Sequence, residues 1–142
     1  MSRVLGIDPG TKRIGVAVSD ADRRVATPIE VVTRRGDLAS DHRALAEIAA
    51  EWEVGLVVVG LPLSLSGGVG PAAQQVLDEV DQLRATLRVP VETYDERLTT
   101  VTAERRLTEQ RMGAKARRKV VDKVAAAVML QAWLDAHTSS PP

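Results

Sequence analysis

Residues 4–19 are VLGIDPGTKRIGVAVS, two apolar runs joined by a turn. Val4–Ile7 and Ile14–Ser19 are rich in β-branched residues, and the Pro and Gly at positions 9 and 10 are typical of a tight turn. We therefore expect the chain to open with a β-hairpin whose first strand runs into an acidic residue, Asp8.

Three further segments have the pattern of strands. Val25–Val32 contains Pro28, which cannot donate to a β-ladder and therefore favours an edge strand. Leu56–Val59 is a short continuous apolar run, typical of a parallel strand that is buried on both faces. Val89–Tyr94 predicts a fifth strand.

Helical spacing of apolar residues appears between and after these strands. From Asp37 to Glu53 an apolar stripe is formed by Leu38, Leu45, Ile48, Ala49 and Trp52, with Asp41, Arg43, Glu47 and Glu51 set off it. A loop rich in Gly and Pro at 60–71 precedes a second helix over 71–87. Further helices are expected over Thr100–Gln110 and from about Arg117 to His137, where the sequence from Val124 on is apolar nearly all round, with a loop at Met112–Lys115 between them.

The element order predicts an α/β fold with a five-stranded mixed sheet, three antiparallel strands followed by parallel ones, and helices on both faces. At 142 residues the chain is expected to form a single domain over 1–137, followed by a frayed tail at 138–142. The absence of Cys, of a signal-peptide pattern and of a long apolar run favours a cytoplasmic protein with no membrane segment.

Three acidic residues stand where chemistry is expected. Asp8 ends an apolar strand, Glu96 and its neighbour Asp95 follow another, and Asp122 lies on the packed side of the last helix near its start. Turn formation, helix capping or an ion pair with a nearby Lys could explain each acid alone. Together they could converge at one edge of the sheet and hold Mg²⁺ or Mn²⁺, because clustered carboxylates need a cation and these ions prefer oxygen ligands.

Other nucleophiles and bases are not indicated. No Ser lies in a G-x-S-x-G motif, and His42, on a polar helix, and His137, near the tail, have no evident partner in the sequence.

Positive charge accompanies the acids although Lys and Arg balance Asp and Glu at 19 each. The Lys and Arg residues near the three acids predict a surface that binds the phosphates of a nucleic acid, whatever its base sequence. A solvated charged surface is the alternative. The candidate nucleic-acid-binding residues are Lys12, Arg13, Arg97, Arg111, Lys115, Arg117, Arg118, Lys119 and Lys123.

Four motifs resemble the YqgF family: GIDPGTKRIGVAVSD at 6–20, GLPLSLSG at 60–67, YDERLTT at 94–100, and Asp122 followed by KVAAAVMLQAWL. The resemblance spans nearly the whole chain. It implies a ribonuclease-H-like fold and a nuclease that depends on Mg²⁺ or Mn²⁺. The expected activity is processing of the 5′ end of pre-16S ribosomal RNA, and the alternative is cleavage of branched DNA as a Holliday junction resolvase. Asp8, Glu96 and Asp122 match the acidic positions of the family.

Resolvases of the wider superfamily differ in two places. They carry an acid at the end of the fourth strand, where this chain has Gly60-Leu61-Pro62, so Glu96 would substitute for it. Ala125 and Ala126 stand where related resolvases have a further acid on the last helix. The number of metal ions at the site, one or two, is therefore open. The sequence also leaves open whether the protein is a monomer or a homodimer.

Two other functions compete with a nuclease. Residues 6–11 also resemble the first phosphate loop of actin-like and sugar-kinase-like ATPases, but these use two such domains and the chain has neither that length nor a Walker motif. A non-catalytic RNA-binding assembly factor would keep the basic residues while the acids only cap and pair.

Overall fold

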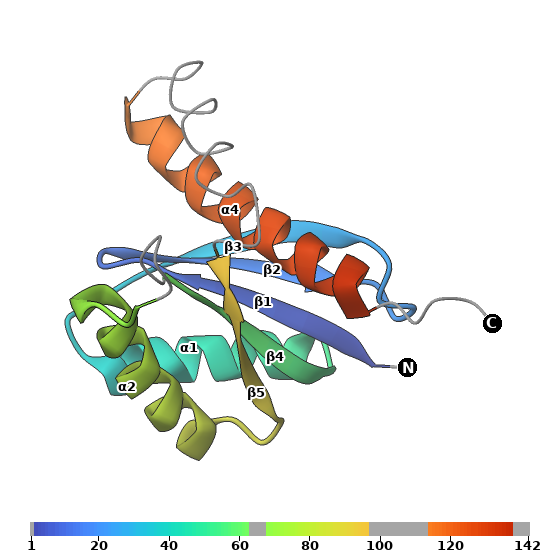
Figure 1. Ribbon diagram of the computed structural model, residues 1–142, viewed down its shortest axis with the longest axis horizontal. Helices are drawn as coiled ribbons and strands as arrows, with labels where there is room; N and C mark the ends of the chain where they lie inside the picture. Colours follow the sequence, from blue (N-terminus) through green and yellow to red (C-terminus); the bar gives the residue numbers. More distant parts are fainter. Residues whose placement is uncertain (1, 63–67, 97–113, 138–142) are drawn as a thin grey trace.

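The structure is a computed structural model that describes residues 2–62, 68–96 and 114–137, with the side chains of residues 114–122 outside the description. Within these ranges the chain forms one five-stranded sheet between helices (Figure 1). The predicted helix at Thr100–Gln110 and the predicted tail at 138–142 lie outside the described residues.

The sheet is mixed, as the sequence predicts, with the strand order β3-β2-β1-β4-β5. Neighbours β1, β2 and β3 are antiparallel, whereas β4 runs parallel to both β1 and β5. The strand at Val25–Val32 is at an edge, as its proline predicts, and the apolar run at Leu56–Val59 lies inside the sheet. The bounds are β1 Arg3–Pro9, β2 Arg13–Ser19, β3 Ala26–Thr33, β4 Val54–Leu61 and β5 Val91–Asp95.

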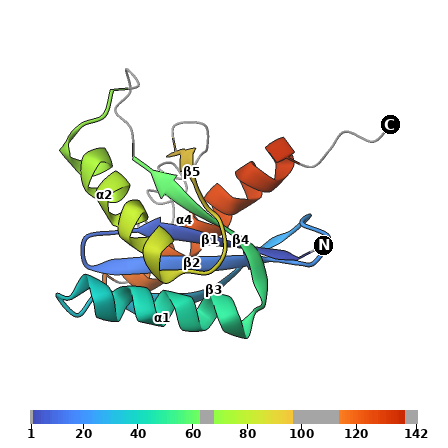
Figure 2. The same ribbon diagram turned by 90° about the horizontal axis from the view of Figure 1, so that it is seen from below.

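Helices cover both faces of the sheet. Figures 1 and 2 show α1 (Leu38–Glu51) and α2 (Pro71–Thr86) on one face and α4 (Ala114–His137) across the other. The side chain of Asp37 accepts a hydrogen bond from the backbone N–H of Ala39 and caps the start of α1. None of the helices in the described ranges is long and apolar enough to cross a membrane.

Alternation along the strands divides the core in two. The larger part packs against α1 and α2 and includes Leu5, Ile7, Val57 and Val59. The smaller part packs against α4 and includes Val4, Leu56 and Val58. The side of the sheet that a strand residue faces can therefore be read from its position relative to these residues.

The last helix differs from its prediction in two ways. It begins at Ala114, so Ala114 and Lys115 are helical and not part of a loop. It also buries one side, with Met129 and Leu130 buried but Val128 only half-buried. Among the described side chains of α4 one side is buried and the other half-buried, whereas the sequence predicts burial nearly all round from Val124 on.

Candidate active site

Asp8 lies near the end of β1 on the face of the sheet that α4 covers. Val4 of the same strand packs in the core against α4, and residues an even number of positions apart share a face of a strand. Asp8 is only 4% exposed. Because burying a carboxylate costs free energy, this position argues against an acid that only starts a solvent-exposed turn.

Glu96 follows β5, and its carboxylate lies against Gly60 of β4. A Cβ added to Gly60 would lie 2.6 Å from Oε1 of Glu96, closer than real Cβ contacts. That Cβ would point toward α4, because Val58 two residues earlier does so. The buried Oε1 of Glu96 therefore lies on the same face of the sheet as Asp8.

The strand register brings the two carboxylates to one edge. Ile7 of β1 pairs with Val59 of β4, so the next residue, Asp8, comes beside Gly60. Tyr94 of β5 pairs with Gly60 from the other side and packs in the core against α4. Alternation then puts Asp95 on the opposite face, which leaves Glu96 as the acid of this pair that shares a face with Asp8.

Two contacts fix how α4 lies on the sheet. A Cβ at Gly6 would lie 2.8 Å from Cβ of Leu130, so the missing side chain lets the helix approach β1 closely. Gln131 accepts a hydrogen bond from the backbone N–H of Ala26 at 2.9 Å, at the beginning of β3. The first half of α4 consequently extends toward the edge where β1 and β5 end (Figure 1).

Asp122 belongs to this first half. It lies eight residues before Leu130, about 12 Å back along the helix axis. Its side chain lies outside the described residues, so its convergence with Asp8 and Glu96 stays a prediction. Among the described side chains no group of three or more His, Asp or Glu could hold a metal ion. The predicted group of Asp8, Glu96 and Asp122 includes one side chain that is not described.

The predicted cations separate into three sets. Lys12 and Arg13 lie in and after the turn that follows Asp8, and Lys123 is half-buried on α4. Arg97 and Arg111 lie outside the described residues. The backbone of α4 includes Lys115, Arg117, Arg118 and Lys119, whose side chains are not described.

A buried polar network on the other face of the sheet was not predicted. Arg34, just after β3, donates two hydrogen bonds to the carboxylate of Glu79 on α2, at 2.9 and 2.8 Å, and approaches Asp41 of α1 at 3.4 Å. Nε2 of His42 lies 2.9 Å from the same carboxylate of Glu79. The network joins β3, α1 and α2.

These contacts correct two sequence-based expectations. Asp41 is 2% exposed and not on a solvated side of α1, and the buried His42 has a partner in Glu79. Both residues precede Leu45 by four and three positions, which is the spacing of the buried stripe. That spacing was the available signal, and it was missed because the two residues are polar.

The network lowers the pKa of one of its acids. Burial raises the pKa of Glu79, but the hydrogen bonds and positive charge of Arg34 and the contact with His42 together outweigh it, so the pKa lies below its ordinary value. Burial lowers the pKa of Arg34, and Glu79 and Asp41 more than offset this. Both partners are thus held in their charged forms.

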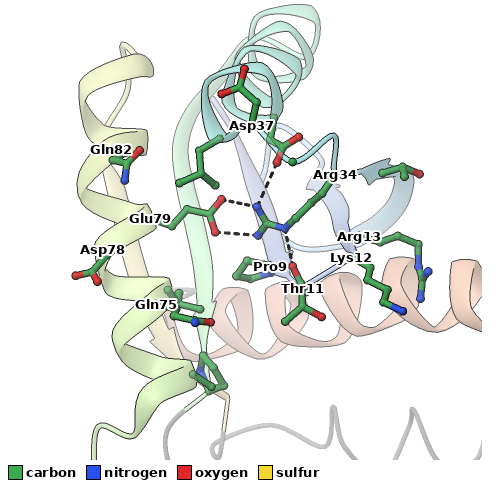
Figure 3. A pocket seen from close by; sticks show the side chains of 18 residues that line it. Pro9, Thr11, Lys12, Arg13, Arg34, Asp37, Gln75, Asp78, Glu79 and Gln82 are labelled. Carbon is green, nitrogen blue, oxygen red and sulfur yellow. Dashed lines mark hydrogen bonds and ion pairs between the residues drawn. The ribbon is translucent and has the colours of Figure 1, made fainter.

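A pocket of about 980 Å³ opens above this network. Figure 3 shows the turn residues Thr11, Lys12 and Arg13 on one side, Gln75 and Asp78 of α2 on the other, and the Arg34–Glu79 pair between them. The pocket therefore lies on the α1/α2 side of the turn that follows Asp8.

Residues 2–136 match the sequence model of a family described as "RuvX: Holliday junction resolvase". The chain belongs to the RuvX family. This confirms the resemblance to the YqgF family, which is the same family. Because the match covers nearly the whole RuvX chain, the interpretation of residues 6–11 as the phosphate loop of a two-domain ATPase is set aside.

Close relatives extend this likeness over almost full length. The RuvX chain is 45% identical over 139 residues to a protein of Caldanaerobacter subterraneus, covering 97% of this chain and 99% of the relative. It is 50% identical over 135 residues to a protein of Myxococcus xanthus, covering 95% and 89%. Both relatives are named "Putative pre-16S rRNA nuclease".

The fold is that of RuvC. A structure of Thermus thermophilus RuvC superposes with a TM-score of 0.60 at 18% identity, covering 99% of both chains. T. thermophilus RuvC in complex with a Holliday junction substrate gives 0.56 at 20% identity, covering 100% of both. These matches confirm the predicted ribonuclease-H-like fold for the RuvX chain.

Proposed function

We propose that this RuvX protein is a metal-dependent nuclease that cleaves a phosphodiester bond of the 16S ribosomal RNA precursor in the cytoplasm. The observation that carries the proposal is the placement of Asp8 and Glu96 on one face at one edge of the sheet, with Gly60 leaving room for the second carboxylate. The names of the relatives at 45% and 50% identity support the substrate.

The donor set fits a hard divalent cation. Asp8, Glu96 and Asp122 offer carboxylate oxygens alone, the ligands that Mg²⁺ and Mn²⁺ prefer. An ion held by these three residues would supply an activated water and stabilise charge on the phosphodiester. All three acids come from the same chain, so the proposed site needs no second copy.

Positive side chains would hold the substrate beside the acids. Lys12 and Arg13 follow Asp8 directly, and the basic residues of the segment 111–123 precede or surround Asp122 in the sequence. Such contacts neutralise phosphates and fix the position of a strand without reading its bases. Substrate choice therefore depends on the shape of the nucleic acid.

Branched DNA is the second candidate substrate. The family description, a Holliday junction resolvase, favours it. A strand of either nucleic acid presents the same phosphates to the acids and cations described above, so the two substrates are separated by experiment.

Purified protein is incubated with a labelled fragment spanning the 5′ end of 16S RNA and with a labelled four-way DNA junction, each in Mg²⁺, Mn²⁺ or EDTA. We expect metal-dependent cleavage of the RNA fragment at a defined position, abolished in an Asp8→Asn protein. Preferred cleavage of the junction would favour a resolvase. Binding of RNA with no cleavage in any metal would contradict the enzyme and favour a non-catalytic assembly factor.

A further inference from the structure

The residue that links the buried network to the candidate active site is Arg34. Its Nε donates to the backbone carbonyl of Gly10 at 2.7 Å, and its backbone N–H donates to the carbonyl of Lys12 at 3.0 Å. The rest of its guanidinium is held by Glu79 and Asp41. One side chain thus ties the turn between β1 and β2 to α1 and α2.

The internal conformation of that turn is restricted by contacts between its own residues. The N–H of Gly10 donates to the carbonyl of Arg13 at 2.9 Å, and a Cβ at Gly10 would lie 2.5 Å from the same oxygen. The turn starts one residue after Asp8 and carries Lys12. A shift of the turn would move Lys12 directly and would act on Asp8 through Pro9, the residue that joins Asp8 to the turn.

On the α1/α2 side the turn borders the pocket, which separates Thr11 from Gln75 among the side chains that the structure describes (Figure 3). Arg34 crosses this space at its floor and is hydrogen-bonded to both walls, the turn at Gly10 and α2 at Glu79. Without that link the pocket leaves room for the turn to shift.

We propose that Arg34 is a positioning residue, which holds the turn so that Asp8 and Lys12 keep the placement needed for cleavage. The inference rests on the proposed function, because it assumes that Asp8 is a metal ligand. A buried ion pair gains little stability over well-packed apolar residues. Orientation of the turn is the effect that such a pair supplies and apolar residues do not.

The first test is Arg34→Lys, which keeps the positive charge but lacks the fork that reaches Gly10, Glu79 and Asp41 together. The matched control is Arg84→Lys, since Arg84 also joins a backbone carbonyl, that of Val91, and a carboxylate, that of Asp81, on the surface. Cleavage is measured well below the melting temperature. We expect kcat to fall roughly 10- to 100-fold in Arg34→Lys, with KM for the nucleic acid little changed and a higher Mn²⁺ concentration at half-maximal rate, and no such change in the control.

A double variant separates positioning from stability. Arg34→Met alone leaves Glu79 buried without its main partner, whereas Arg34→Met combined with Glu79→Met removes both charges of the closest pair and leaves Asp41 and His42 without these partners. We expect the double variant to regain part of the melting temperature that Arg34→Met loses, because the buried charge of Glu79 is gone, and to remain impaired in cleavage, because the bond to Gly10 is still absent. Activity that returns together with stability would overturn the inference.

The outcomes for the two proposals are distinct. Normal kcat and normal Mn²⁺ dependence in a folded Arg34→Lys protein would refute the positioning role and leave the nuclease assignment standing. A wild-type protein that cleaves neither RNA nor the DNA junction would refute the proposed function and the positioning role together.

Discussion

Gly60 and Glu96 share one small space at the edge of the sheet where β1, β4 and β5 end. A Cβ on Gly60 would lie 2.6 Å from Oε1 and 3.1 Å from Cδ of Glu96. The glycine therefore gives the carboxylate its place beside Asp8. Glu96, the residue after β5, is therefore placed beside the end of β4, where the sequence analysis expects it to substitute for an acid that this chain lacks.

We expect Gly60→Ala to displace the carboxylate of Glu96 and reduce Mn²⁺-dependent cleavage at least tenfold, a loss of about 1.4 kcal/mol in transition-state stabilisation. The control is Gly70→Ala, because a Cβ at Gly70 meets nothing within 4 Å. Both variants are assayed for cleavage and for melting temperature. Equal activity in the two variants would contradict the assignment of Glu96.

Asp8→Asn should lose the stabilisation that Mn²⁺ gives to the folded protein. A ligand that binds the native state raises the melting temperature by mass action, so the wild type should show a rise between EDTA and Mn²⁺ that the variant lacks. Asp81→Asn, at an acid on α2 that is 77% exposed, should keep the full rise. A full Mn²⁺-dependent rise in Asp8→Asn would remove Asp8 from the site.

Much of the fold could be predicted from the sequence because its signals are local. The turn at Asp8–Arg13, the proline of β3 and the apolar run of β4 each act within a few residues, and each predicted its strand. Because β1, β4 and β5 are predicted to be parallel, their carboxyl ends are expected at the same edge of the sheet. The placement of Asp8 at an edge of the sheet needed no more than this.

The spacing of Asp41 and His42 signals burial, but the buried network itself could not be predicted, because Glu79 is polar and far in sequence from its partners. Arg34 and Glu79 are separated by 45 positions, and only the folded chain brings them to 2.8 Å. The contribution of Gly60 was likewise hidden, since the sequence shows a missing acid where the structure shows room for Glu96. Long-range pairs of this kind depend on the packing of α1 against α2.

The pKa of Glu79 gives the folded protein an acid-dependent stability. Because the folded-state pKa lies below the ordinary value of 4.5, the contribution is fully present above about pH 4.5 and is lost as the pH falls through the folded-state pKa. Glu79→Gln should cost about 2 to 3 kcal/mol at neutral pH, and its difference from the wild type should shrink below pH 4.5. Urea denaturation between pH 3 and 7 measures this, and a difference that grows toward low pH would contradict the assigned charge state.

Changing Arg117 and Arg118 together to Ala should weaken binding to RNA and DNA alike. Each arginine that binds a phosphate in the wild type should, once replaced, reduce the slope of log affinity against log salt concentration by about one unit. Binding is followed by fluorescence anisotropy at several salt concentrations. Arg84→Ala, at the far end of α2, serves as the control for the removal of an arginine, and an unchanged slope in the double variant would mean that this part of α4 is a solvated surface.

Asp122→Asn decides between the catalytic and the structural interpretation of the remaining acid. If Asp122 joins Asp8 and Glu96, the metal-free variant should be as stable as the wild type or slightly more stable, because one of three repelling charges is removed, and cleavage should be abolished. If it only favours the helix dipole or pairs with Lys119 or Lys123, the variant should lose up to roughly 1 kcal/mol and cleave normally. Thermal melts in EDTA beside a cleavage assay in Mn²⁺ separate the two patterns, and a destabilised but fully active variant would exclude Asp122 from the catalytic set.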